Sequence, residues 1–292
     1  MLKEIKDKFP AWCEDTETKY QLIMSDDIDA FMCYQMQKLN YGRECEYFIN
    51  SSKDRAYKGY YGEKTGKQYF YNTDNATNKT KNTIALDFSI NKNVKAWDNH
   101  VVHIGNHETN YNTLSANMNL VNNINKNNYT QKFCISTFIT MLSYYEVKIQ
   151  NWTHDELIAL CGIDGLYQPF KNSKFIEQGK KNLHLLGFDF LSDFIQENLK
   201  EIEQFDQKYY KNKSIWVNKD GYLETNLDLD KLSDIWGFNM ELPKQQFNLK
   251  RTLESRIFDT SYSKEQLENK YNKKIFNIAL TYRSSGVVSF IG

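Results

Sequence analysis

Short apolar runs that end near acidic residues place the tightest limits on how this chain can fold. The runs "YQLIMS" (20–25), "CEYFINS" (45–51), "TIALDFSI" (83–90) and "VKAWDNHVVHI" (94–104) have the length and composition of buried strands. Between the first two, apolar residues recur at helical spacing from Ile28 to Leu39, and "NYG" ends that run. Strands that alternate with helices in this way favour an α/β fold with parallel strands.

The rest of the chain predicts further helices and a second unit. Residues 129–147 and 153–165 have the pattern of two helices, and Thr153 is a plausible N-cap for the second. The polar run 52–82 predicts a long loop or a small hairpin insertion. We expect a domain of residues 1–194 with a mainly parallel sheet flanked by helices, a linker helix over 195–214, and a smaller C-terminal α+β domain of residues 215–292. That last domain would end in a hairpin around "RSSG".

Charge and cysteine usage exclude some classes of protein. Lysine plus arginine and aspartate plus glutamate both number 37, so the net charge is zero. Such a chain lacks the uniform positive field of a tight duplex-DNA binder, although it can still carry a local basic groove. Its five cysteines form no C-x-x-C pair and fit a reducing compartment. With no apolar leader at the N-terminus and no run of 18 apolar residues, we expect a cytoplasmic protein without a membrane span.

The acids at the strand ends suggest a metal site. Asp27 and Asp29 follow the first strand, Asp87 interrupts the third, and Asp98 lies in the fourth. Ligands of open parallel sheets bind outside the carboxyl ends of the strands, where these acids would meet. Crowded buried carboxylates either have raised pKa values or bind a cation. With His100 added, the set suits Mn²⁺ or Mg²⁺ better than a thiolate zinc site, and a bridging acid would allow two ions.

These residues also have structural interpretations, which the sequence leaves open. Asp26 or Asp27 could cap the helix that follows, and His100 could form only a structural hydrogen bond with Asp98. Asp87 is harder to explain in this way, because a lone buried acid is costly. The remaining candidates are interpreted as surface-loop, structural or core residues: His103 and His107 in a surface loop, His154 and His184 as structural, and Cys134 on the apolar face of a helix.

The order of the acidic motifs resembles that of the DHH phosphoesterase superfamily, which includes single-strand exonucleases, oligoribonucleases, cyclic-dinucleotide phosphodiesterases and manganese pyrophosphatases. "DDIDAF" resembles its first motif through Asp27 and Asp29, and "IALDFSI" resembles its second through Asp87. "WDNHVV" stands where the family has Asp-His-His, and "LCGIDG" offers Asp164 for the fourth motif. The resemblance covers roughly residues 18–190 and implies a DHH-like α/β fold.

The resemblance also implies roles for these residues. Asp27, Asp29, Asp87 and Asp164 would be ligands of two Mn²⁺ or Mg²⁺ ions. His100 would be a further ligand or a phosphate contact, oriented by Asp98 as carboxylates orient metal-bound imidazole. The sequence departs from the family in two places: Asn99 replaces the usual first His of the third motif, and Ser25 stands where many members have His. An amide oxygen is a poorer ligand for Mn²⁺ than imidazole, so the second ion would be held more loosely.

A further set of residues is predicted to contact the substrate. Lys132, Ser136 and Thr137 lie after the third motif and are candidate phosphate contacts, together with Asn99. "ALTYRSSGVVSFIG" resembles the strand that precedes a glycine-rich turn in the family, although the Gly-Gly-Gly-His turn itself does not occur in this sequence. Arg283 in that segment could bind a phosphate as a bidentate donor, or could be a surface arginine of a hairpin turn.

These features predict a metal-dependent phosphodiesterase in which His100 and Asp98 assist the attack of water. The neutral charge favours short single-stranded oligonucleotides or cyclic nucleotides over long duplexes, and the many aromatic residues could stack on bases. One alternative is a DHH-like protein that binds a nucleotide as a sensor or a sequestering protein without cleaving it. Another is a pyrophosphatase or polyphosphatase.

Overall fold

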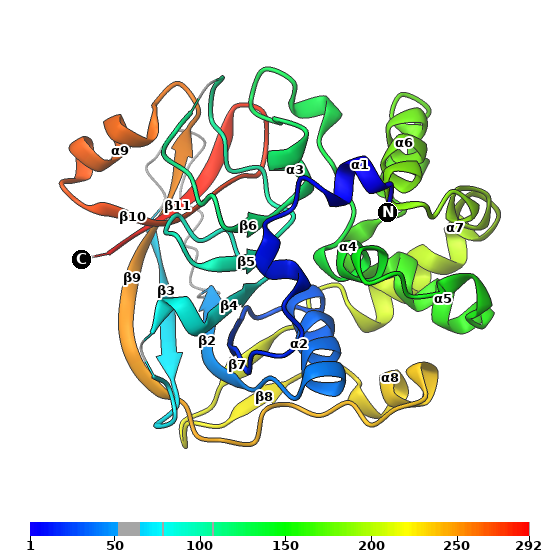
Figure 1. Cartoon of the computed structure of the whole chain (residues 1–292), viewed down its shortest axis with the longest axis horizontal. Coiled ribbons are helices and arrows are strands. Elements are labelled where there is room, and N and C mark those ends of the chain that lie inside the picture. The colour runs from blue at the N-terminus through cyan, green and yellow to red at the C-terminus, as the bar shows by residue number, and fades with distance from the viewer. Residues whose placement is uncertain (52–64, 78, 107, 292) are drawn as a thin grey trace.

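A nine-stranded mixed sheet forms the centre of the molecule (Figure 1). The computed structural model describes residues 1–51, 65–77, 79–106 and 108–291. The strand order is β10-β11-β9-β3-β2-β1-β4-β5-β6, and β7 and β8 form a separate two-stranded sheet. The α/β class expected from the sequence is confirmed, whereas the sheet is mixed rather than mainly parallel.

The strands have the following bounds: β1 Gln21–Met24, β2 Cys45–Ser51, β3 Thr65–Asn72, β4 Thr83–Leu86, β5 Lys95–Trp97, β6 Ser115–Ala116, β7 Ile215–Val217, β8 Leu223–Thr225, β9 Asn248–Asp259, β10 Lys274–Leu280 and β11 Ser285–Ile291. The α-helices are α1 Lys3–Lys6, α2 Ile28–Tyr41, α3 Met118–Val121, α4 Thr137–Tyr144, α5 His154–Gly162, α6 Ile176–Leu186, α7 Phe190–Tyr209, α8 Leu229–Trp236 and α9 Lys264–Tyr271. Short 3-10 helices are η1 Ala11–Glu14, η2 Thr80–Asn82, η3 Tyr129–Gln131, η4 Ile149–Asn151, η5 Ile163–Gly165 and η6 Gln168–Lys171.

The parallel half of the sheet consists of β2, β1, β4, β5 and β6. Its strands are apolar at successive positions because both faces are covered. Leu22 and Met24 face the large core under the helices, while Ile23 between them belongs to a second core on the opposite face. Burial on both sides explains why these strands appear in the sequence as continuous apolar runs rather than alternating ones.

The antiparallel half consists of β3, β9, β11 and β10. β3 lies within the run 52–82, where the sequence predicted a loop or small hairpin, and residues 52–64 and 78 of that run lie outside the described residues. β9 pairs with β3 over most of its length, so the C-terminal strands continue the sheet of the N-terminal part. The division into domains 1–194 and 215–292 stays a prediction, and the shared sheet crosses it.

Helices α2 and α4–α8 cover one face of the sheet (Figure 1). The helix predicted over 129–147 is confirmed only for its second half, because α4 begins at Thr137. Ser136 caps it by accepting a hydrogen bond from the Ile139 amide, so the chain before it adopts a 3-10 turn and a loop. Cys134 therefore lies in this loop, partly buried, and not on a helix as expected.

Other local predictions are confirmed. Thr153 caps α5 in a complete capping box with Glu156. β10 and β11 form the predicted hairpin at the end of the chain. The predicted linker helix over 195–214 begins earlier and ends earlier, as α7. Within the described part of the chain, no helix combines the length and the apolar character that crossing a membrane requires.

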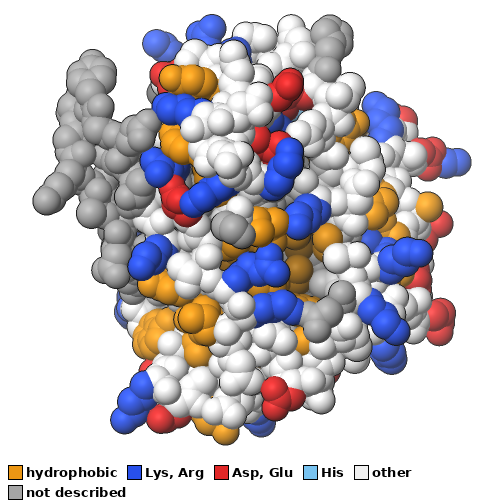
Figure 2. All heavy atoms as spheres, turned by 90° about the vertical axis from the view of Figure 1, so that its left-hand side faces the viewer, with side chains coloured by type: hydrophobic (Ala, Val, Ile, Leu, Met, Phe, Trp, Pro, Cys, Tyr) orange, Lys and Arg blue, Asp and Glu red, His pale blue; other side chains and the backbone are white. Residues whose placement is uncertain are grey.

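The face of the molecule beside β9 and β10 is locally basic. Figure 2 shows Lys and Arg side chains gathered around exposed hydrophobic side chains on this face. Lys250 and Arg251 of β9 and Lys92 of the loop after β4 are exposed and lie near one another, since burial and then the positive charge of Arg251 lower the pKa of both lysines. The zero net charge of the chain thus hides an uneven distribution of charge.

Candidate metal centre

The candidate site lies at the carboxyl edge of the parallel strands, where the direction of the chain connections reverses. From β1 the chain passes to β2 on one side, and later returns to β4 on the other side. The carboxyl ends of β1 and β4 therefore border the crevice in which open α/β sheets bind their ligands. Asp27 and Asp29 follow β1, and Asp87 follows β4 directly.

Asp87 is held rigidly at this edge. Its backbone amide donates to Trp97 of β5 at 2.9 Å, and its carbonyl accepts from the Ser25 hydroxyl at 3.3 Å. The residue has a φ of 49°, a left-handed conformation that costs a non-glycine residue free energy and occurs frequently at functional sites. Its buried carboxylate accepts a hydrogen bond from the Thr137 hydroxyl at 2.7 Å. The turn at Asp87 ends β4 and aims the carboxylate toward the N-terminus of α4.

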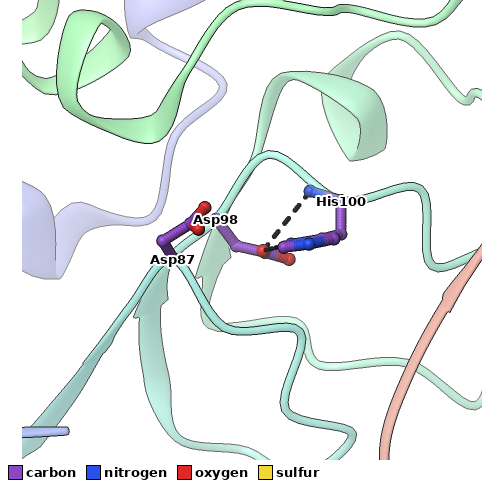
Figure 3. Close-up of side chains that lie close together, drawn as sticks. All are labelled: Asp87, Asp98 and His100. Carbon is purple, nitrogen blue, oxygen red and sulfur yellow. Dashed lines mark hydrogen bonds and ion pairs between the residues drawn. The ribbon is translucent and has the colours of Figure 1, made fainter. Parts of the chain in front are cut away.

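Asp98 and His100 form a pair beside Asp87 (Figure 3). The Asp98 carboxylate lies 2.7 Å from Nδ1 of His100 and also accepts the backbone amide of His100 at 3.3 Å. The second oxygen of Asp98 accepts from Asn117 Nδ2 at 3.0 Å, and Asn117 also donates to the His100 carbonyl at 2.8 Å. With Nδ1 engaged by Asp98, the Nε2 atom of His100 is left to face a ligand.

Asp87, Asp98 and His100 form the one group of at least three His, Cys, Asp or Glu residues in the described chain whose ligand atoms all lie within 4.8 Å of one another. The donor set combines carboxylate oxygens with one imidazole, which suits Mn²⁺ or Mg²⁺. Asp98 is already bound to both His100 and Asn117, so in a metal centre it would orient His100 and would leave Asp87 and His100 as the ligand donors. The chemistry of these residues fits a hard divalent cation.

Asp27 and Asp29 lie at the start of α2 and are both tied to helix N-termini. Asp27 caps α2 by accepting the Ala30 amide at 3.0 Å, which confirms the capping role considered from the sequence. Asp29 is buried, and its two oxygens accept the amides of Thr137 and Phe138 at 2.7 and 2.8 Å. Asp29 thereby supplies the anion at the N-terminus of α4, where unpaired amides favour negative charge.

Asp164 approaches the site from the 3-10 turn after α5. Like Asp87, it has a left-handed backbone conformation, with a φ of 52°. Its carboxylate is solvent-exposed and accepts a hydrogen bond from Asn99 Nδ2 at 2.7 Å. Asn99 therefore presents its NH₂ group to Asp164, and its backbone carbonyl accepts from Asn119 at 2.6 Å.

The electrostatic coupling of these groups shows that the acids share one environment. Burial, together with the charges of Asp87 and Asp164, raises the pKa values of Asp27 and Asp29 well above the ordinary carboxyl range. Burial also raises the pKa of Asp87 to about 7, even though the positive charge of His100 opposes the change. Such a concentration of carboxylates favours protonation or the binding of a cation.

The same negative charges raise the pKa of His100, because they stabilise its protonated form. Burial by itself would lower the pKa of the imidazole, but its charge interaction and hydrogen bond with Asp98, reinforced by Asp87 and Asp164, raise it to about 10. The imidazolium partly neutralises the acids in the absence of a metal ion. The predicted ligands Asp27, Asp29, Asp87, His100 and Asp164 therefore lie around one crevice, although only Asp87 and His100 belong to the compact group.

The predicted substrate contacts divide into two sets. Ser136 and Thr137 are buried and bind protein groups, Ser136 as the cap of α4 and Thr137 through Asp29 and Asp87. Their contact with a phosphate stays a prediction. Lys132 is exposed and lines a pocket of 580 Å³ that also borders Asn99, His100 and Asp164. Arg283 is exposed in the β10–β11 turn, two residues beyond the pocket-lining Thr281.

Two asparagines that contact the candidate site were not among the residues predicted from the sequence. Asn117 is fully buried and holds both Asp98 and His100. Asn119 donates to the carbonyls of Asn99 and Phe133 and accepts the Phe133 amide. A signal was present, because Asn117 directly precedes the apolar run "MNLV" and caps α3. The contacts with residues 98–100 could not be inferred from that signal.

The other histidines that the structure describes lie outside this site. His103 was expected at the surface, but it is buried against the ring of Tyr111, with ring centroids 4.7 Å apart, so that prediction was wrong. His154 pairs with Glu201 and His184 with Asp189, which agrees with structural roles. His107 lies outside the described residues.

Comparison of the chain with protein-family models, with curated proteins and with solved structures found no match.

Proposed function

We propose that this chain is a metal-dependent phosphodiesterase of the DHH-like type that hydrolyses phosphodiester bonds in short single-stranded oligonucleotides or cyclic nucleotides. The observation that carries the proposal is the meeting of acids from four separate segments at one sheet edge, where they are coupled electrostatically: Asp27 and Asp29, Asp87, Asp98 and Asp164. Structural roles account for some of these acids individually, but the crowding of ionised carboxylates lowers stability unless they are protonated or a cation is bound.

The arrangement of the parallel strands around the acids is part of the same proposal. The parallel strands have the order β2-β1-β4-β5-β6, and the acids lie on both sides of the β1–β4 switch point. This placement is what an α/β enzyme with its site at the switch point requires. Leu280 and Thr281 at the end of β10 line the pocket, and Arg283 follows them in the exposed turn, which fits a substrate-binding role for the C-terminal residues.

Some residues of the centre would bind the metal ions, and others would position those ligands or the substrate. Asp87 and His100 would hold a first Mn²⁺ or Mg²⁺ ion, and Asp27 and Asp164 would hold a second, looser one. A divalent ion in this centre supplies Lewis-acid polarisation of the phosphate and lowers the pKa of water. Asp98 and Asn117 fix the orientation of the His100 ring, and Lys132 would attract the phosphate from the exposed side of the pocket.

A specific observation also favours a second function, the binding of a nucleotide without cleavage. Asn99 is committed to Asp164 through its NH₂ group, and both oxygens of Asp29 accept backbone amides. Four of the five predicted metal ligands therefore accept hydrogen bonds from protein donors, and Asp29 does so through both of its oxygens. A centre with one ion would still bind a phosphate, but it would lack the second positive charge that stabilises the leaving oxygen in two-metal enzymes.

Metal content and turnover together test the proposal. The protein is purified without chelator, its bound metals are identified and counted, and it is assayed with Mn²⁺ on bis-para-nitrophenyl phosphate, on a short single-stranded oligonucleotide and on pyrophosphate. We expect one or two Mn²⁺ or Mg²⁺ ions per chain and hydrolysis of the diesters. Nucleotide binding without turnover would support the binding protein, release of phosphate from pyrophosphate alone would support a pyrophosphatase, and the absence of divalent-metal binding would exclude the metal-dependent functions.

A further inference from the structure

The pocket beside the candidate centre is lined partly by residues that are not predicted metal ligands. Asn99, His100 and Asp164 border one side of its 580 Å³ volume, which is in the range of pockets that hold small organic ligands. Its lining also includes Tyr129 and Lys132, Phe175 and Gln178 at the start of α6, and Leu280 and Thr281 at the end of β10. Any group held there lies directly next to the reacting centre.

Two aromatic rings contribute to this lining. Phe175 is a large apolar side chain that remains 38% exposed, and it lies at the pocket just before α6. Tyr129 is partly buried, and its hydroxyl donates to the Leu280 carbonyl at 3.3 Å, which fixes the orientation of the ring. The Lys132 ammonium lies 5.5 Å from the centroid of the Tyr129 ring. The pocket therefore combines flat apolar surface with a positive charge on the same side.

The side-chain amide of Gln178 also lines the pocket, and hydrogen bonds fix its position. Gln178 donates through Nε2 to the Gln131 carbonyl at 3.0 Å and to Asn182 Oδ1 at 2.9 Å. Gln168 supplies a second amide to the lining. Fixed hydrogen-bonding groups beside aromatic faces are what recognition of the edge and face of an unpaired base requires.

We infer that this pocket holds a single unpaired nucleobase next to the reacting phosphate, with Phe175 as a stacking surface, Gln178 at the edge of the base and Lys132 at the phosphate. The inference rests on the proposed function, because it assigns the substrate class of the same site. A base in this position favours short single-stranded nucleotides over inorganic pyrophosphate or polyphosphate, since neither of these has a flat apolar group. A base-paired duplex presents no free face to the ring.

Stacking can be measured without turnover. The probe is a phosphorothioate-linked dinucleotide that contains 2-aminopurine, whose fluorescence falls when the base stacks on an aromatic ring. We expect quenching on binding to the full-length protein in the presence of Mn²⁺. Phe175→Ala should abolish most of the quenching and weaken binding roughly tenfold, whereas Phe175→Trp should retain both. Phe190→Ala is the matched control, because Phe190 is similarly exposed, at 37%, but lies on α7 and does not line the pocket.

A second probe keeps the test independent of whether a variant folds. The same dinucleotide with an abasic site should bind the unmodified protein roughly tenfold more weakly than the probe with its base. Equal binding of the two probes, or quenching that Phe175→Ala leaves unchanged, would overturn the inference even if diesters are hydrolysed. Quenching that depends on Phe175 in a protein that hydrolyses no diester would support the inference while contradicting the phosphodiesterase.

Discussion

The parallel and antiparallel halves of the sheet place their charged residues in different ways. In the parallel half, the strands point in one direction, so acids from β1, β4 and β5 reach the same edge. In the antiparallel half, neighbouring strands point in opposite directions, and charge lies on an open face beside β9 (Figure 2). Lys250 and Arg251 are exposed there, whereas Asp87 and Asp98 are buried. Strand direction thus separates a buried acidic edge from an exposed basic face.

This difference has an energetic consequence. Exposed charges on β9 are screened by water, so their removal changes stability little. Buried acids cannot be screened in this way and depend on protonation, on hydrogen bonds or on a cation. Each experiment below tests whether the acidic edge is an energetically distinct site, beginning with the largest expected effect.

The largest effect is expected for Asp87→Asn. In the compact group of Asp87, Asp98 and His100, Asp98 orients His100. Removing the Asp87 charge would therefore leave His100 as the only residue of the group available to bind the ion. We expect diester turnover to fall by roughly a thousandfold and bound Mn²⁺ to be lost. The metal-free variant should be at least as stable as the unmodified protein, because repulsion among the acids is reduced. Turnover and metal content near the unmodified level would show that Asp87 is structural.

Glu254→Gln in the antiparallel half is the matched control. Glu254 pairs with Arg256 and Lys273 on the open face of β9, and these hydrogen bonds lower its pKa. Its replacement should cost about 1 kcal/mol or less and leave Mn²⁺ binding unchanged. If this substitution affected metal binding as strongly as Asp87→Asn, the contrast between edge and face would be lost.

The second prediction concerns pH. The pKa of Asp87 is 3.8 in the unfolded chain and about 7 in the folded one, so the folded state loses stability as pH rises through this interval. His100, with a folded pKa of about 10, contributes stability that is complete below 6.5 and is lost as pH rises toward 10. We therefore expect the Tm of chelator-treated protein to fall between about pH 4 and pH 10. Mn²⁺ should raise the Tm more at pH 8 than at pH 5, as measured by thermal denaturation.

A smaller effect is expected for Asn117→Ala. Because Asn117 holds both Asp98 and His100, its loss should free the His100 ring and weaken Mn²⁺ binding or turnover by roughly 10- to 100-fold. Titration with Mn²⁺ and steady-state kinetics measure the two effects. Asn40→Ala removes only a contact with the Met36 carbonyl of α2 and should change neither quantity. An unchanged metal affinity in Asn117→Ala would remove this residue from the centre.

The smallest effect on the centre is expected for Gly286→Ala, which perturbs the antiparallel half. An added Cβ would lie 2.5 Å from the Ala279 carbonyl and 2.6 Å from the Phe258 ring, so β11 must shift. We expect a loss of about 1–3 kcal/mol in urea denaturation, with Mn²⁺ affinity retained in the folded protein. Gly105→Ala, where the Cβ meets no atom within 4 Å, should have little effect. Loss of metal binding in folded Gly286→Ala protein would show that the two halves are coupled.

Local features were predictable from the sequence because they depend on neighbouring residues. The apolar run 20–25, the helical spacing from Ile28 and the cap at Thr153 all correspond to elements of the structure. The helix predicted over 129–147 was too long, because Ser136 offers its hydroxyl to the Ile139 amide and starts the helix there. The capping signal competed with a continuous apolar pattern, and the pattern alone did not reveal the start of the helix.

The acids themselves were predictable, but their partners were not. The positions of Asp27, Asp87 and Asp98 near strand ends follow from where the continuous apolar runs occur in the sequence. The role of Asn117 depends on β6 lying beside β5, and that of Asp29 depends on the docking of α4 over 100 residues later. The pocket wall at Phe175 likewise requires α6 to pack near residues 129–134.

By itself, the sequence determined part of the secondary structure, such as β1, α2 and the cap of α5, and the positions of the acids near strand ends, because backbone preferences and capping act over a few residues. The tertiary structure alone decided that β9 extends the sheet at β3, that Asn117 holds Asp98 and His100, and that α4 receives Asp29 at its N-terminus. Contacts of this kind join residues far apart in the chain, so they depend on strand register and helix docking, which no local pattern encodes.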